Sequence, residues 1–291
     1  PDAHTLSGDA IVSHNPADPS DTVWAASQAV DHVEPAIRAA REALAAWRRT
    51  SLDDRVNVVR AFQAIAAERV EEMGQLICRE TGKAIWDSMG EAKLLAAKVD
   101  ITLDDAQNAG LGRVRDFELD LYASRKGNCT FRPHGVMAVI GQINFPAHLP
   151  NGHIIPALVT GNTVVFKSSD KAPAIGQLLA TWYREALEAC GRPLGVVNMV
   201  HGAADVASRL VGTDGASRAR EAQADGVLFT GSWPVGRRIL EANLDTPGRI
   251  VALEMGGNNP AGGMPDAYLK HAAVECVRAA YITTGQRCTC T

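Results

Sequence analysis

The chain has 291 residues, of which 46% are hydrophobic and 21% charged, and its formal net charge is −4. This balance is typical of a globular protein, and a negative charge with scattered Lys and Arg argues against a nucleic-acid partner. No apolar run approaches the roughly 18 residues that a membrane-spanning helix needs, so we expect no membrane partner. The six cysteines form no CxxC pair and no zinc-ligand spacing, which favours reduced thiols, no metal site and a cytoplasmic location.

The first part of the chain is predicted to be helical after a turn-rich segment at residues 15–19. Apolar residues recur at helical spacing over 33–47, 51–81 and 84–107. Between Asp116 and Arg132 the pattern changes to short β-prone pieces around a Gly-Asn pair, which predicts a hairpin.

From residue 136 onward, short β-branched strands alternate with helices. The predicted strands are 136–140, 163–167, 196–200, 226–230 and 249–254, and the helices between them are 150–159, 173–189, 203–212 and 234–243. This alternation predicts right-handed crossovers and therefore an α/β fold, with a parallel sheet covered on both faces. Asn144, Lys167, Gly231 and Glu254 each end or follow a strand, where ligands of such sheets bind. A last helix is predicted over 268–282.

Two residues near the end of the chain could form and then hydrolyse a thioester. Cys288 offers a thiol in a short polar loop, and Glu254 offers a carboxylate at the end of a strand, before a glycine pair. Each has a plainer interpretation, since a lone Cys is often a small buried hydrophobe and such a Glu is often a solvated strand end. Cys288 and Cys290 could also be a metal or redox pair, although no His or Cys cluster accompanies them.

Four segments in one order resemble the aldehyde dehydrogenase superfamily. They are 141–146 (GQINFP), 229–236 (FTGSWPVG), 253–258 (LEMGGN) and 284–290 (TGQRCTC). The resemblance runs from about Val12 to the last residue and implies a Rossmann-like parallel sheet of the aldehyde dehydrogenase type, followed by only the start of the catalytic domain. The implied division is an N-terminal helical part of the NAD-binding domain (1–115), a hairpin of the oligomerisation arm (116–134), the Rossmann-like NAD-binding domain (135–253) and the start of the catalytic domain (254–291).

The resemblance implies a role for each of three catalytic residues. Cys288 would attack a small-molecule aldehyde, and Asn144 would help to hold the resulting oxyanion together with the nucleophile's own backbone N–H. Glu254 would be the general base that activates water against the thioester. From the residues alone, Asn144 in Asn-Phe-Pro could instead be a turn former.

NAD is the cofactor that the resemblance implies. Ser232 can cap the helix that begins at Trp233-Pro234, and a helix N-terminus attracts phosphate. A carboxylate at Asp170, where the family usually has Glu, would repel the 2′-phosphate of NADP. Lys167, whose plainer interpretation is a surface lysine, matches the family lysine that bonds the adenosine ribose. The full set of expected cofactor-binding residues is Lys167, Asp170, Gly231, Ser232, Gly236 and Phe145.

Three local segments narrow the resemblance to one branch of the superfamily, whose substrate is a semialdehyde. They are 148–158, 257–260 and 287–290. Residues 141–143 (GQI) depart from the family's Gly-Pro-aromatic sequence before Asn144. Because the family continues well beyond the nucleophile, the resemblance predicts a C-terminally truncated part of a homodimeric or homotetrameric parent, inactive by itself. The alternatives are an enzyme for another small aldehyde or a non-catalytic NAD-binding fragment.

Overall fold

A five-stranded parallel sheet lies at the centre of the molecule, in the order β7-β6-β5-β8-β9. The computed structural model describes residues 10–28, 30–106, 108–216 and 219–290. The strands are β5 (Val136–Ile140), β6 (Thr163–Lys167), β7 (Val197–Val200), β8 (Gly226–Gly231) and β9 (Ile250–Met255). The predicted α/β fold with a parallel sheet is therefore confirmed, and strand boundaries differ from the prediction by at most one residue.

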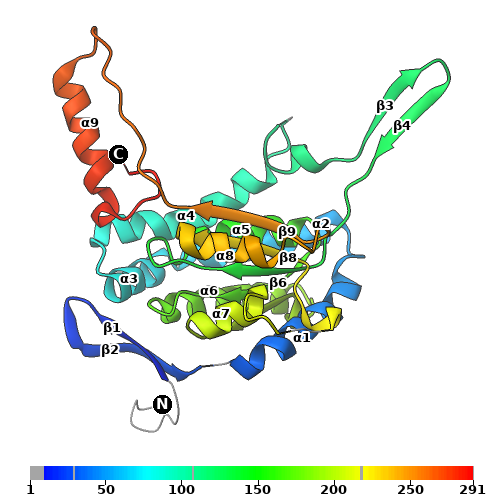
Figure 1. Cartoon of the computed structure of the whole chain (residues 1–291), viewed down its shortest axis with the longest axis horizontal. Helices are drawn as coiled ribbons and strands as arrows, with labels where there is room; N and C mark the ends of the chain where they lie inside the picture. Colours follow the sequence, from blue (N-terminus) through cyan, green and yellow to red (C-terminus); the bar gives the residue numbers. More distant parts are fainter. Residues whose placement is uncertain (1–9, 29, 107, 217–218, 291) are drawn as a thin grey trace.

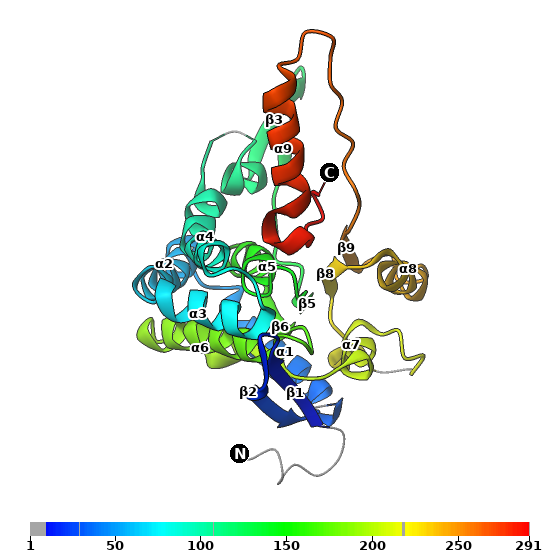
Figure 2. The ribbon, with the colours of Figure 1, turned by 90° about the vertical axis from the view of Figure 1, so that its left-hand side faces the viewer.

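Helices cover both faces of this sheet (Figures 1 and 2). One face packs against α1 (Val33–Trp47), α7 (Ala204–Val211) and α8 (Trp233–Ala242), and the other against α5 (His148–Val159) and α6 (Pro173–Ala189). The helices α2 (Leu52–Glu68), α3 (Val70–Thr81) and α4 (Ile85–Leu103) form an outer layer over α5 and α6.

Side chains of the central strand β5 alternate between two buried cores. Val136, Ala138 and Ile140 belong to the core under α1, α7 and α8. Met137 and Val139 belong to the larger core under α5 and α6. This alternation follows from the two-residue period of a strand, and it explains why β5 reads as a continuous apolar run.

The N-terminal part contains a β-hairpin that the sequence did not predict. Strand β1 (Ala10–Asn15) pairs antiparallel with β2 (Asp18–Ser27), and the predicted turn at 15–19 connects them. Ser13 of β1 donates a hydrogen bond of 2.6 Å to Glu80, so this hairpin is fixed to α3 by a contact distant in sequence. The single helix predicted over 51–81 is also divided into α2 and α3, since Arg69 leaves helical geometry.

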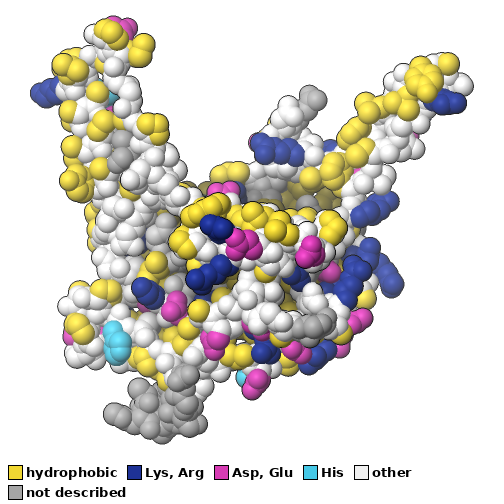
Figure 3. Space-filling model, in the orientation of Figure 1, with side chains coloured by type: hydrophobic (Ala, Val, Ile, Leu, Met, Phe, Trp, Pro, Cys, Tyr) yellow, Lys and Arg dark blue, Asp and Glu magenta, His cyan; other side chains and the backbone are white. Residues whose placement is uncertain are grey.

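Two elements extend away from the sheet and its helices. The predicted hairpin is present as β3 (Phe117–Tyr122) and β4 (Arg125–Cys129), and α9 (Leu269–Tyr281) stands apart at the opposite end (Figure 1). Figure 3 shows hydrophobic side chains along both elements. The exposed apolar residues there include Phe117, Leu119 and Leu121 of the hairpin and Leu269, Val274, Val277 and Tyr281 of α9.

Short 3-10 helices complete the fold. They are η2 (Val30–His32), η3 (Gly110–Val114), η4 (Leu194–Val196), η5 (Arg220–Ala222) and η6 (Ile282–Gly285).

No helix in the described part of the chain is long and apolar enough to cross a membrane.

Candidate active site

The candidate site lies at the carboxyl ends of β5, β8 and β9. Strand order reverses here, because β6 and β7 follow on one side of β5 while β8 and β9 lie on the other. Parallel sheets of this kind bind ligands at such a point. A cavity of about 570 Å³ opens there, and its lining includes Asn144, Glu254 and Cys288. The structure therefore brings the three predicted catalytic residues into one cavity.

Of the two neighbouring cysteines, only Cys288 faces this cavity. Cys288 is exposed and lines the wall. Cys290 is buried, and its Sγ lies 3.4 Å from the carbonyl oxygen of Gly285. Burial of Cys290 among backbone carbonyls gives it a packing role and leaves Cys288 as the accessible thiol.

A tight loop after α9 presents Cys288. Thr283, Thr284 and Gly285 have φ angles of 60°, 54° and 70°, three successive residues in the left-handed region. β-branched residues rarely adopt this conformation, so the two threonines carry backbone strain. The side chain of Arg287 donates a hydrogen bond of 2.8 Å to the Thr283 hydroxyl and holds the turn together. In Figure 2 this loop lies below α9, between α5 and β9.

Asn144 connects the loop after β5 to the loop that carries the thiol. Its side-chain amide donates a 3.2 Å hydrogen bond to the carbonyl oxygen of Gln286, two residues before Cys288. The contact places an amide donor beside the loop that carries Cys288, as the predicted oxyanion-binding role would require.

A buried ion pair supports the Asn144 loop from beneath, and sequence reasoning missed it. The ammonium of Lys83 lies 2.5 Å from the Glu91 carboxylate, and both side chains are at most 2% exposed. Lys83 also donates to the backbone carbonyl of Asn144 at 2.9 Å. The other oxygen of Glu91 accepts the backbone N–H groups of Ala147 and His148, at 3.0 and 3.1 Å, and so caps the start of α5.

Burial raises the pKa of Glu91, while Lys83 and the two amide donors oppose that rise. The sequence did contain a signal for this pair. Glu91 falls at helical spacing with Leu95 and Val99 on the buried face of α4, and an acid at such a position is almost always paired.

Glu254 of β9 forms one side of the cavity. It is exposed, and in the sheet it lies opposite Thr230 of β8. The Thr230 hydroxyl is 3.2 Å from Nε2 of His153, a residue of α5 that also lines the cavity. Burial, assisted by the positive charge of Lys98, lowers the pKa of His153 to about 4, so its ring is neutral at physiological pH.

A second cavity, of about 380 Å³, lies beside the first and contains most of the expected cofactor residues. Lys167, Asp170, Gly231 and Ser232 line it. It shares Gln142, Thr230 and Gly231 with the first cavity, so the two are neighbours.

Lys167 is not the surface lysine of the plainer interpretation. It is 5% exposed, and burial lowers its pKa while Asp170 and Asp205 oppose the shift. Within the described chain, its ammonium group makes no hydrogen bond and is available to a ligand.

Two other expected cofactor residues lie outside the lining of both cavities. Gly236 is in α8, where an added Cβ would come within 2.6 Å of the Met255 sulfur, so the glycine permits close packing of α8 on β9. Phe145 is buried, with the Lys83 ammonium 4.2 Å and the Arg287 guanidinium 5.4 Å from its ring centre. These cation–π contacts make Phe145 a support of the catalytic loops in this structure.

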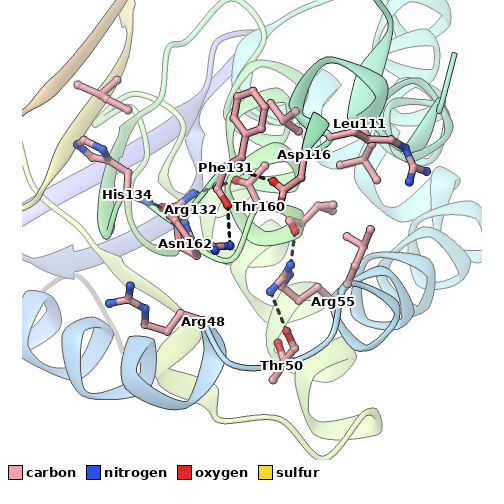
Figure 4. A pocket seen from close by; sticks show the side chains of 16 residues that line it. Arg48, Thr50, Arg55, Leu111, Asp116, Phe131, Arg132, His134, Thr160 and Asn162 are labelled. Carbon is pink, nitrogen blue, oxygen red and sulfur yellow. Dashed lines mark hydrogen bonds between the residues drawn. The ribbon is translucent and has the colours of Figure 1, made fainter. Parts of the chain in front are cut away.

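A larger cavity of about 860 Å³ near the base of the β3–β4 hairpin contains none of the predicted site residues (Figure 4). Its polar groups are used for structure. Arg55 donates to the carbonyls of Thr50 and Val159 at 2.9 and 2.8 Å, and Asn162 accepts the backbone N–H of His134 at 2.6 Å. The predicted catalytic residues lie instead in the smaller cavity that contains Cys288.

The chain belongs to the aldehyde dehydrogenase family, whose sequence profile matches residues 4–291. Solved structures with the same fold support this. A structure described as an E. coli NADP dependent enzyme has a TM-score of 0.85 and 27% identity, over 98% of this chain and 56% of that one. The NAD-dependent aldehyde dehydrogenase of Sinorhizobium meliloti has a TM-score of 0.83 and 29% identity, over 97% and 53%.

Curated relatives are similar at higher identity. The N-succinylglutamate 5-semialdehyde dehydrogenase of Paraburkholderia xenovorans (strain LB400) is 42% identical over 284 residues, which is 97% of this chain and 55% of the relative. The enzyme of that name from Burkholderia thailandensis is 40% identical over the same shares. The chain thus spans about half the length of the curated relatives that it matches.

Proposed function

We propose that the protein, at the full length of its relatives, oxidises an aldehyde to a carboxylic acid through a thioester on Cys288. One observation carries the proposal: an accessible thiol, an amide donor and a carboxylate line one cavity, and a neighbouring cavity that shares part of its lining contains a buried lysine.

Each of the three residues has its own step in the proposed reaction. The thiolate of Cys288 attacks the carbonyl carbon, and Asn144 with the backbone N–H of Cys288 stabilises the oxyanion. The hydride that leaves this carbon would be accepted by the nicotinamide of NAD, held by the residues of the second cavity. Glu254 then removes a proton from water, the water oxygen attacks the thioester carbon, and the carbon–sulfur bond breaks to release the acid and the thiolate.

The groups that line the second cavity suit the phosphate and ribose parts of a dinucleotide. Its donor set combines the buried ammonium of Lys167 with the start of α8 at Ser232, whose side chain makes no capping bond. A positive group and a helix N-terminus both suit phosphate and ribose oxygens. Asp170 is exposed at the rim, where its charge favours NAD over NADP.

The proposed substrate is N-succinyl-L-glutamate 5-semialdehyde, and the product is N-succinyl-L-glutamate, a step in arginine catabolism. Support comes from the 42% and 40% identity to relatives of that name. Another small aldehyde is the alternative substrate. We further propose a homodimer or homotetramer, located in the cytoplasm, where the free cysteines stay reduced.

The test is a pair of substitutions in the full-length protein, measured by NADH absorbance with the semialdehyde and NAD. Cys288→Ser should abolish NADH production and spare NAD binding in calorimetry, whereas Cys290→Ser should keep substantial activity. Turnover by Cys288→Ser would refute the proposed nucleophile. NAD binding without turnover of any aldehyde by the unaltered protein would instead support a non-catalytic binding unit.

A further inference from the structure

Lys98 is a charged residue of the active-site cavity that the proposed reaction does not use. It lies in α4, is half-buried and lines the cavity that contains Cys288. Its stem packs on Gly152 of α5, where an added Cβ would lie 3.6 Å from the Lys98 Cε. The end of the Lys98 side chain therefore lies beside α5, at the wall of the cavity.

No acidic side chain of the described residues pairs with Lys98. Its ammonium group makes no hydrogen bond with the described residues; the Thr102 hydroxyl donates to the Lys98 backbone carbonyl at 2.9 Å and leaves the charged end free. A half-buried lysine without a partner leaves part of its desolvation cost uncompensated, so it favours an anion beside it.

The other charges in the cavity do not remove this preference. Arg287 is engaged with Thr283 and with the ring of Phe145, and Glu254 lies on β9, while Lys98 comes from α4 on the side of α5. The two histidines of α5 that line the cavity are neutral at physiological pH, since burial lowers the pKa of both. Among the residues that the structure describes, Lys98 is thus the free cation on this wall.

We propose that Lys98 binds a carboxylate of the substrate and makes the cavity selective for anionic aldehydes over uncharged ones. This inference rests on the proposed function, and it places a carboxylate-binding group within this chain. N-Succinylglutamate 5-semialdehyde carries two carboxylates remote from its aldehyde, so one can meet Lys98 while the aldehyde carbon lies at Cys288. An ammonium–carboxylate contact of this kind is charge-assisted and is stronger than a neutral hydrogen bond.

The experiment compares variants of the full-length protein with two aldehydes, the semialdehyde and uncharged hexanal. Lys98→Met should lower kcat/KM for the semialdehyde by roughly 10-fold or more, mainly through KM, and should change kcat/KM for hexanal by less than about 2-fold. Lys98→Arg should restore most of the loss because it keeps the charge. Lys93→Met, an exposed lysine of the same helix, is the matched control and should have no effect.

A second measurement does not depend on turnover. Calorimetry with the product N-succinyl-L-glutamate should show a Kd raised roughly 10-fold in Lys98→Met and unchanged in Lys93→Met. Equal losses with both aldehydes, or unchanged product binding in Lys98→Met, would overturn the assignment. If the unaltered protein oxidises neither aldehyde but binds the product through Lys98, the proposed function fails while the carboxylate site stands.

Discussion

Removing one member of the Lys83–Glu91 pair should destabilise the protein strongly. Lys83→Met leaves the Glu91 carboxylate buried without its cation, because both side chains are at most 2% exposed. Loss of one partner from such a pair typically costs about 3–5 kcal/mol. The same substitution removes the 2.9 Å hydrogen bond to the Asn144 carbonyl, so the loop that carries this amide loses its support.

A second substitution should recover part of that loss. Glu91→Gln in the Lys83→Met background removes the unpaired charge but keeps an oxygen for the N–H groups of Ala147 and His148. We expect the double variant to be more stable than Lys83→Met alone by at least about 1 kcal/mol, because an uncharged amide is far cheaper to bury than a carboxylate.

Urea unfolding of the full-length protein measures these differences, with Lys126→Met as the matched control. Lys126 forms an exposed pair with Glu118 at 3.4 Å, and its loss should cost less than about 1 kcal/mol. If Lys83→Met cost no more than this control, or if Glu91→Gln lowered the stability further, the reasoning about the buried pair would be refuted.

Three further predictions concern the chemistry and its pH dependence. Glu254→Gln should keep a pre-steady-state burst of NADH but turn over slowly in stopped-flow assays, and absence of the burst would assign Glu254 to an earlier step. Asp170→Ser should narrow the preference for NAD over NADP in binding titrations, and a preference of the unaltered protein for NADP would contradict the role of this carboxylate. Burial lowers the pKa of His153 and of His201 to about 4, so the unfolded chain takes up protons first as pH falls. The free energy of unfolding that these neutral rings contribute is complete above about pH 6.5 and is lost progressively toward pH 4. The urea midpoint should therefore fall less over this pH range in the His153→Gln/His201→Gln variant than in the unaltered protein.

The strand–helix alternation after residue 136 could be predicted because it depends on the hydrophobic pattern of short local segments. Runs such as Val136–Ile140 are apolar and β-branched, and each is followed by a helical period. The strands β1 and β2 were missed, because they are partly polar and β1 is fixed by the contact between Ser13 and Glu80, 67 residues apart in sequence. A contact between residues so far apart produces no periodic pattern of apolar residues in the sequence.

The candidate site was predictable to a similar extent. Asn144 and Glu254 could be placed at one edge of the sheet because they lie at or after the ends of parallel strands, whereas Cys288 was predicted from its thiol and from the family resemblance of its loop. Lys83 and Lys98 could not be placed there from sequence, because Lys83 lies in the connection between α3 and α4, Lys98 lies in α4, and both reach the site only through tertiary packing. Their roles depend on burial and on partners, which the sequence does not state.

The most direct test of the account is to identify the atom that carries the acyl group. Full-length Glu254→Gln protein, mixed with the semialdehyde and NAD and quenched in acid, should accumulate a thioester, because its hydrolysis is slowed. Peptide mass spectrometry should then find the N-succinylglutamyl mass on Cys288 and none on Cys290. Production of NADH with the mass on Cys290, or with no covalent adduct, would contradict the central claim.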